Sequence, residues 1–313
     1  MKKHFKRPLS LLLAILLCIG MLPVSASAAD LTGSMSMIDI KGRDHALSSS
    51  LPAPFGGYAS EKYTMLRITD SSTGATKTAY CLELGISTYY QEQYQPSADY
   101  PQFSQEQKEL INAVLTLGYN TDTGGKYRGS PEDEYIATQI LVWLIAHKQL
   151  GTQYENQIVS EFTVNSPGAK AVFTKLRKAV MDYRTIPSFA CGDSKYASSH
   201  TYELKYNAQT GKYETTLTDS NGVLSEFSFS QPGVSFARTG NQLKISSEKT
   251  SFSTVSGEKK LPSSIAGVVK GASRYWLNEH YQNVVTFEVG GEPLPVKAYF
   301  GLEVKAGHLK IVK

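Results

Sequence analysis

The chain has 313 residues, of which 41% are apolar and 19% are charged, and its formal net charge is +4. The first 29 residues contain four basic side chains and no acidic one, so the rest of the chain is neutral overall. The positive charge therefore gives no reason to expect a nucleic acid or an acidic lipid surface as partner, and the length allows two ordinary domains with apolar cores.

The N-terminal residues have the three parts of a secretory signal peptide. Four basic residues between Lys2 and Arg7 precede an apolar run from Leu11 to Leu22, and small residues from Ala26 to Ala29 supply a cleavage site. The apolar run is shorter than the roughly 20 residues that a transmembrane helix needs. We therefore expect residues 1–29 to be a signal peptide and the protein to be secreted.

Cysteine usage leaves two possibilities open. Cys18 lies in the predicted signal peptide, so only Cys81 and Cys191 would reach the outside. Two cysteines in an exported protein are compatible with one disulfide. The other possibility is that Cys81 is an inert buried thiol with no disulfide.

The first predicted domain covers residues 30–186 and begins with β-structure. Asp30 to Tyr63 is rich in Ser and Gly, and we expect it to be weakly structured. Thr64 to Thr69 and Thr76 to Leu84 are typical of two strands, and the turn residues 70–74 join them in a hairpin. Cys81 falls near the end of the second strand.

Three helices are predicted next from their start signals. Ser104 with Gln107 forms a capping box and opens a helix to about Leu117. Ser130-Pro131 opens a second helix that ends near Gly151, and its six apolar residues 140–145 indicate burial on all sides. Ser166-Pro167 opens a third helix, which Pro187 ends.

The chain after Pro187 changes to short strands separated by turn residues. Strands are expected at 202–206, 213–218, 224–229, 243–246, 284–289 and 297–304. Spacing of this kind favours a β-sandwich, which we assign to residues 187–305. Residues 306–313 would begin another module.

Two short segments carry a family resemblance. The sequence AYCLELG at 79–85 and the sequence YIATQILVW at 135–143 resemble the paired motifs of the thioester domains, also called TQXA domains, of Gram-positive adhesins and pilus-tip proteins. The resemblance implies a thioester bond between Cys81 and Gln139, with Tyr80, Thr138 and Trp143 at flanking motif positions. It also implies an α+β domain in which helices are inserted in a β-sheet, and a Cna-B-like repeat that starts at 306–313.

Two positions differ from the family pattern. Leu141 stands where the family has a small Ala, two residues after the glutamine, and Leu84 stands where Pro is common. Leu141 would affect how closely the helix approaches the cysteine strand. Leu84 keeps an apolar character at its position.

The residues around the two motifs fit such chemistry. Tyr135 and Trp143 lie four residues before and after Gln139, on the same helix face, and we expect them to shield the bond from water. Glu83 and Tyr80 are candidates for the acid that helps ammonia leave. Fold-imposed proximity can contribute several kcal/mol to such a reaction, up to about 7–11 in well-oriented systems.

Other interpretations remain open at this point. Gln139 could be an ordinary buried carboxamide, and Cys81 an inert thiol or half of a disulfide with Cys191. A cysteine-nucleophile enzyme would use Cys81 with His147 or His280 as base. A third possibility is a non-covalent pilus or wall spacer. We expect neither a metal nor a cofactor, because the His and Cys residues show no ligand spacing.

The resemblance thus implies a secreted cell-surface adhesin that couples once to a primary amine and is not a turnover enzyme. A lysine of a host protein is the expected target. Other pilus or cell-wall components are expected partners, and the cell wall is the expected location.

Overall fold

The computed structural model describes residues 32–58, 63–89, 91–291 and 295–305. The predicted signal peptide, residues 1–29, and the predicted start of a repeat, residues 306–313, lie outside these ranges. The described residues form an α+β part built on one closed sheet and a β-part built on two four-stranded sheets. The predicted fold class, α+β followed by a β-sandwich, is confirmed.

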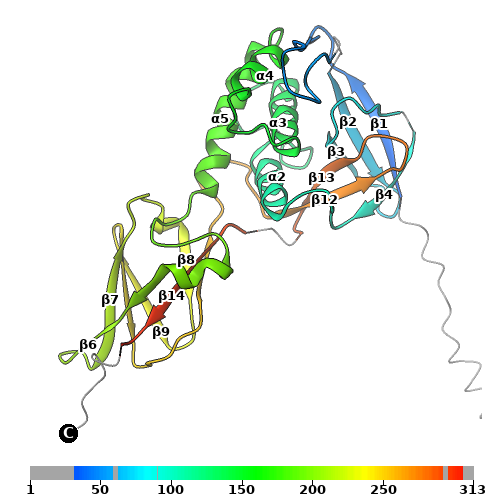
Figure 1. Ribbon diagram of the computed structural model, residues 1–313. Helices are drawn as coiled ribbons and strands as arrows, with labels where there is room; N and C mark the ends of the chain where they lie inside the picture. The colour runs from blue at the N-terminus through cyan, green and yellow to red at the C-terminus, as the bar shows by residue number, and fades with distance from the viewer. Residues whose placement is uncertain (1–31, 59–62, 90, 292–294, 306–313) are drawn as a thin grey trace, which may run out of the picture. The chain divides into compact units, whose positions relative to one another are not determined.

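Six antiparallel strands close into a barrel in the order β1-β2-β3-β13-β12-β4. These strands come from distant parts of the chain, and Figure 1 shows the orange β12 and β13 beside the blue and cyan β1–β4. Their bounds are β1 Gly33–Asp39, β2 Thr64–Asp70, β3 Thr76–Cys81, β4 Gln93–Ser97, β12 Gly271–Leu277 and β13 Val284–Val289.

Side chains fill the inner face of the barrel. A Cβ added at Gly33 would lie 2.6 Å from the Trp276 ring and 2.8 Å from the Ile68 side chain. The Trp276 indole N–H donates to Thr286 Oγ1 at 3.0 Å, and the Arg274 guanidinium stacks on its ring at 4.7 Å. The barrel is therefore a packed core that holds each strand, including β3 with Cys81, in a fixed position.

The helices after β4 cover the outer face of this barrel. Helix α2 packs on β12 and β13, α3 packs on β3, and α5 packs on both helices. Ser104 and Gln107 form the predicted capping box of α2, and the Ser130 side chain caps α3 just before Pro131. The bounds are α2 Gln105–Leu117, α3 Pro131–Ala146, α4 Glu155–Phe162 and α5 Pro167–Arg184.

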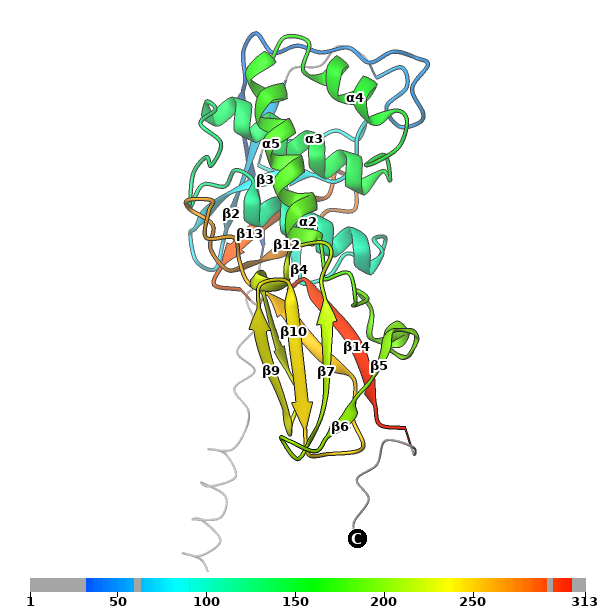
Figure 2. The ribbon, with the colours of Figure 1, turned by 90° about the vertical axis from the view of Figure 1, so that its left-hand side faces the viewer.

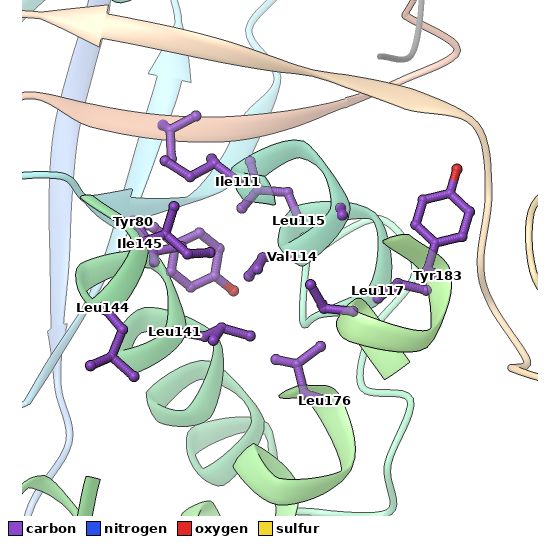
Figure 3. Packing of buried hydrophobic residues seen from close by; sticks show 14 of the residues in the cluster. Tyr80, Ile111, Val114, Leu115, Leu117, Leu141, Leu144, Ile145, Leu176 and Tyr183 are labelled. Atoms are coloured by element: carbon purple, nitrogen blue, oxygen red, sulfur yellow. The ribbon is translucent and has the colours of Figure 1, made fainter. Parts of the chain in front are cut away.

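Helix α3 is buried on every side, as its apolar run predicts. Figure 3 shows Leu141, Leu144 and Ile145 of α3 in a cluster with Leu117 of α2 and Leu176 of α5. Such a helix cannot rotate or slide without opening cavities in the core. Its position relative to β3 is therefore well defined.

The second part consists of the sheets β6-β7-β10-β9 and β5-β14-β11-β8. Figure 2 shows β9, β10 and β7 side by side. Aromatic rings from both sheets meet, with Phe229 of β8 placed 6.2 Å from Phe236 of β9 and 5.6 Å from Phe300 of β14. The bounds are β5 Thr201–Glu203, β6 Lys205–Asn207, β7 Lys212–Thr218, β8 Phe227–Ser230, β9 Val234–Thr239, β10 Gln242–Ser247, β11 Val255–Lys259 and β14 Lys297–Glu303.

The structure corrects several expectations drawn from the sequence. Residues 284–289 form a strand as expected, but β12 and β13 complete the barrel although the sequence places 187–305 in the second domain. Residues 33–39, expected to be weakly structured, form β1, and residues 224–226 form a 3-10 turn before β8. Pairing between strands that are far apart in the chain leaves no local sequence signal.

Across the described ranges, we find no helix whose length and apolar character would let it span a membrane.

Candidate functional site

Polar and aromatic side chains recur at every fourth residue along one face of α3. They are Tyr135, Gln139, Trp143 and, at the C-terminal cap, His147. Residues four apart lie one above the other on a helix. These four side chains therefore form a row that faces β3 and the segment following it.

Gln139 contacts the main chain of Cys81 through both atoms of its amide. The Cys81 N–H donates to Gln139 Oε1 at 2.8 Å, and Gln139 Nε2 donates to the Cys81 carbonyl oxygen at 2.9 Å. Gln139 is 2% exposed and Cys81 is 9% exposed. The structure thus brings together the two predicted thioester residues, which are 58 positions apart, at a buried point where the helix meets the strand.

Tyr135 makes an equivalent contact one helical turn earlier. Its hydroxyl donates to the Ala79 carbonyl oxygen and accepts from the Leu66 N–H, each at 3.2 Å. Four helical residues advance by about 6 Å, and two strand residues advance by about 6.6 Å. The spacing of Tyr135 and Gln139 on α3 therefore matches the spacing of Ala79 and Cys81 on β3, which fixes the register between helix and strand.

The row continues beyond the end of β3. His147 Nε2 accepts a hydrogen bond from the Leu84 N–H at 3.2 Å, so this nitrogen carries no proton in the contact. Burial lowers the pKa of His147, and nearby Glu83 opposes the shift. His147 is thus a neutral imidazole that holds the segment after Cys81 against the helix.

A cavity of about 250 Å³ opens beside Cys81 and Gln139. Trp143 is one wall; it is 7% exposed and stacks on Phe162 with ring centroids 5.2 Å apart. No carboxylate, Lys or Arg is found among the described residues that line this cavity. The lining consists of Met37, His45, Tyr58, Tyr63, Thr64, Leu66, Cys81, Ile86, Ser87, Thr88, Gln139, Trp143 and Gln282.

The other predicted site residues support the site from outside the cavity. The Tyr80 hydroxyl donates to the Tyr119 carbonyl oxygen at 2.6 Å, on the helix-facing side of β3. Thr138 Oγ1 accepts from the Tyr119 N–H at 3.1 Å. The Glu83 carboxylate accepts from the Tyr100 hydroxyl at 2.9 Å and from the Asn283 N–H at 2.8 Å. Glu83 and Tyr80, the candidate acids, are thus held in structural hydrogen bonds.

Part of the chain matches a known protein family. Residues 78–181 match the family model described as the thioester domain, and this stretch includes both Cys81 and Gln139. The chain contains a thioester domain. The resemblance that the two motifs predict is thereby confirmed for this domain.

A solved structure is also similar to the chain. It is the thioester domain of the Staphylococcus aureus TIE protein, with 14% sequence identity and a TM-score of 0.46 over 88% of this chain and 100% of that chain. No curated protein matches the chain.

The two residues that depart from the family pattern, Leu141 and Leu84, are both buried. Leu141 follows Gln139 by two residues, which is about 200° around the helix, so it points away from Cys81. Figure 3 shows Leu141 directed toward Leu117 and Leu176, in the core between α3, α2 and α5. Leu84 is buried, at 5% exposure, and its N–H is bound by His147. Whether Leu141 affects the approach of the helix to the cysteine strand stays a prediction.

The residues of the alternative interpretations lie elsewhere. Cys81 and Cys191 are not joined in a disulfide. Cys191 pairs through its main chain with Tyr299 of β14, and its thiol donates to the Tyr299 and Asp193 carbonyl oxygens at 3.3 Å. His280 is exposed, and neither it nor His147 lines the cavity that contains Cys81.

Sequence reasoning missed His45 and Gln282 in the thioester domain. His45 is 3% exposed, and its ring lies 4.6 Å from Tyr63 and 4.8 Å from Phe162. Burial lowers the pKa of His45 to about 4, and Asp44 opposes the shift. Gln282 comes from the loop before β13 and donates to the Glu83 carbonyl oxygen. Both residues reach the cavity through tertiary packing, which no local motif signals.

Proposed function

We propose that the protein is a secreted adhesin of the cell surface whose Cys81–Gln139 thioester reacts once with a primary amine. The favoured target is a lysine of a host protein, and the product is a covalent amide. Other pilus or cell-wall components would be its neighbours. Because each molecule reacts a single time, the protein is not a turnover enzyme.

The observation that carries this proposal is the double hydrogen bond between the Gln139 amide and the Cys81 main chain. A carboxamide buried without partners would cost about 1–3 kcal/mol, so one that is buried and paired holds its position. Here the partner is the backbone of the same residue that carries the nucleophile. The arrangement supports a carboxamide carbon kept within reach of the Cys81 sulfur.

This geometry supports a simple path for closure of the thioester. The Cys81 sulfur attacks the Gln139 side-chain carbon, and the Cys81 N–H at 2.8 Å stabilises the negative charge that develops on Oε1. The C–S bond forms, the C–N bond breaks, and the amide nitrogen leaves as ammonia with the proton of the thiol. The hydrogen bond from Nε2 is lost in this step, whereas the one to Oε1 is kept.

In the second step, an amine of the target opens the thioester and Cys81 becomes the leaving group. An unprotonated amine attacks the same carbon, the C–N bond forms, and the C–S bond breaks. The electron pair of that bond goes to the Cys81 sulfur, which takes a proton and becomes a thiol again. The cavity supports this step because it adjoins both residues and has neutral walls, which favour an uncharged amine over an ammonium ion.

The test is the intact mass of the protein, purified without residues 1–29, before and after treatment with methylamine. We expect a mass short by one ammonia that then rises by one methylamine, and loss of both effects in Gln139→Ala. Gln157→Ala, on the exposed face of α4, should behave as wild type because, within the described ranges, the Gln157 amide bonds to the side chains of Ser50 and Glu161 and not to Cys81.

Two results would contradict the proposal. A mass that matches the sequence, with no gain from methylamine, would leave a non-covalent spacer. Repeated consumption of amine and release of product would instead indicate a cysteine-nucleophile enzyme.

A further inference from the structure

Tyr94 of β4 carries a buried hydroxyl whose hydrogen bond is missing. The side chain is 0% exposed, and among the described residues nothing accepts from or donates to its oxygen. Buried hydroxyls nearly always have a partner, because leaving one unpaired costs stability. A hydroxyl that gains its hydrogen-bond partner only during a reaction is one reason for a protein to keep such a group.

The strand register places Tyr94 and Cys81 on the same face of the barrel. Tyr94 is paired with Gly33, whose added Cβ would meet Trp276, so both lie on the inner face. Cys81 is paired with Val284, and Val284 with Trp276. Directly paired residues of antiparallel strands point to the same side, so the Cys81 side chain also belongs to the inner face.

The strand order places the two residues across the barrel from each other. In the order β1-β2-β3-β13-β12-β4, strand β4 is three strands away from β3 in either direction. An eight-stranded barrel is just wide enough for side chains to fill, and six strands enclose less space. A tyrosine ring from one wall therefore reaches toward the opposite wall.

Electrostatics agree with this placement. Burial raises the pKa of Tyr94 most, and the negative charge that Cys81 carries as a thiolate raises it next, with smaller effects from Glu92, Tyr281 and Glu83. The hydroxyl thus stays protonated and remains a donor. Tyr94 does not line the cavity beside Gln139, so it approaches the sulfur from the barrel side and leaves the path of the amine clear.

We infer that the Tyr94 hydroxyl donates a hydrogen bond to the Cys81 sulfur when the thioester opens. This inference rests on the proposed function. As the amine forms its bond to the Gln139 carbon, the C–S electron pair moves to sulfur, and the Tyr94 O–H stabilises the thiolate. The thiolate then takes the proton that the attacking nitrogen releases. Tyr94 gives up no proton overall.

The experiment compares Tyr94→Phe with wild type and with Tyr275→Phe. Tyr275 is a matched control, because its hydroxyl is also buried and finds no partner in the described part of the chain. It lies one residue from Trp276 and therefore on the other face, stacked on Tyr100 at 5.6 Å. For each protein, the intact mass shows whether the ammonia is missing. A time course at pH 7 to 9 gives the rate of reaction with methylamine, and thermal unfolding gives the melting midpoint.

We expect Tyr94→Phe to open about 10- to 100-fold more slowly at every pH, which is the effect of one hydrogen bond to a charged group. Its melting midpoint should be no lower than that of wild type, since the hydroxyl makes no hydrogen bond to any residue that the structure describes. Tyr275→Phe should open at the wild-type rate. Tyr94→Phe could also fold without the ammonia deficit while Tyr275→Phe keeps it. That result would show that the Tyr94 hydroxyl also assists the closure of the thioester.

The inference is overturned if Tyr94→Phe shows the deficit and opens at the wild-type rate, while the proposed function stands. If wild type itself shows no deficit, the proposed function fails first. Should Tyr94→Phe melt below wild type, 3-fluorotyrosine at position 94 replaces it, because its more acidic hydroxyl is a stronger donor. Opening should then be faster, and an unchanged rate would overturn the inference.

Discussion

At the scale of single residues, the site depends on two side chains that hydrogen-bond to main chain. Gln139 contacts both polar main-chain atoms of Cys81, and Tyr135 bridges Leu66 and Ala79 one turn away. A side chain that bonds to the backbone of a strand aligns that strand more strictly than an apolar contact does, because hydrogen bonds are directional. Tyr135 therefore orients the strand.

We predict that Tyr135→Phe destabilises the protein by about 1–3 kcal/mol, because it leaves the buried Leu66 N–H without a partner. The fraction of closed thioester should fall as well, since the register of α3 on β3 is less strictly held. Urea unfolding measures the first effect and intact mass the second. Tyr196→Phe, with Tyr196 57% exposed, should change neither; equal stability of Tyr135→Phe and wild type would contradict the prediction.

At the scale of elements, helix α3 is positioned by its neighbours as much as by β3. Its Thr138 binds the residue that follows the C-cap of α2, because the Tyr119 N–H donates to Thr138 Oγ1 at 3.1 Å. Gly118, at the C-terminal cap of α2, allows this close approach. A Cβ there would lie 2.7 Å from Thr138 Oγ1 and 2.7 Å from the Val114 carbonyl oxygen.

We predict that Gly118→Ala destabilises the protein by about 1–3 kcal/mol through overpacking between α2 and α3. The backbone at Gly118 has φ −84°, which any residue can adopt, so crowding alone causes the effect. Gly192→Ala is the control, because an added Cβ at Gly192 meets no atom within 4 Å. Chemical denaturation compares Gly118→Ala with Gly192→Ala. Equal denaturation midpoints would show that the neighbours of Gly118 move aside without loss of stability.

At the scale of the whole molecule, buried imidazoles make folding sensitive to acid. His45 and His147 both have a pKa below that of a free histidine because burial disfavours their charged form. In the unfolded chain they take up protons near pH 6.5, whereas in the folded chain they stay neutral to lower pH. The unfolded state therefore binds more protons as the pH falls, and the free energy of unfolding decreases.

We predict that His45 alone lowers the free energy of unfolding by about 3 kcal/mol between pH 6.5 and 4, given its folded pKa of about 4. His45→Phe should lose less stability over this window than wild type does, because Phe cannot be protonated. Urea unfolding at pH 7.5 and pH 4.5 gives the comparison. His280→Gln, at an exposed position, should lose as much stability as wild type does. An equal loss of stability in wild type, His280→Gln and His45→Phe would contradict the prediction.

Local signals in the sequence determined the parts of the site. Start signals such as Ser104 with Gln107 and Ser130 with Pro131 located helices α2 and α3, because capping is a local interaction. The two motifs identified Cys81 and Gln139, and the four-residue spacing of Tyr135, Gln139 and Trp143 put them on one helix face. All of this depends on residues close together in the chain.

Only the tertiary structure decided how these parts meet. It showed that β12 and β13, far from β3 in the chain, close the barrel around Cys81, and that Tyr94 and His45 approach the site. It also placed Leu141 in the core beside Leu117 and Leu176. Strand pairing and core packing join residues with no fixed spacing, so their outcome depends on the whole chain minimising its buried unpaired groups and cavities, which no short segment encodes.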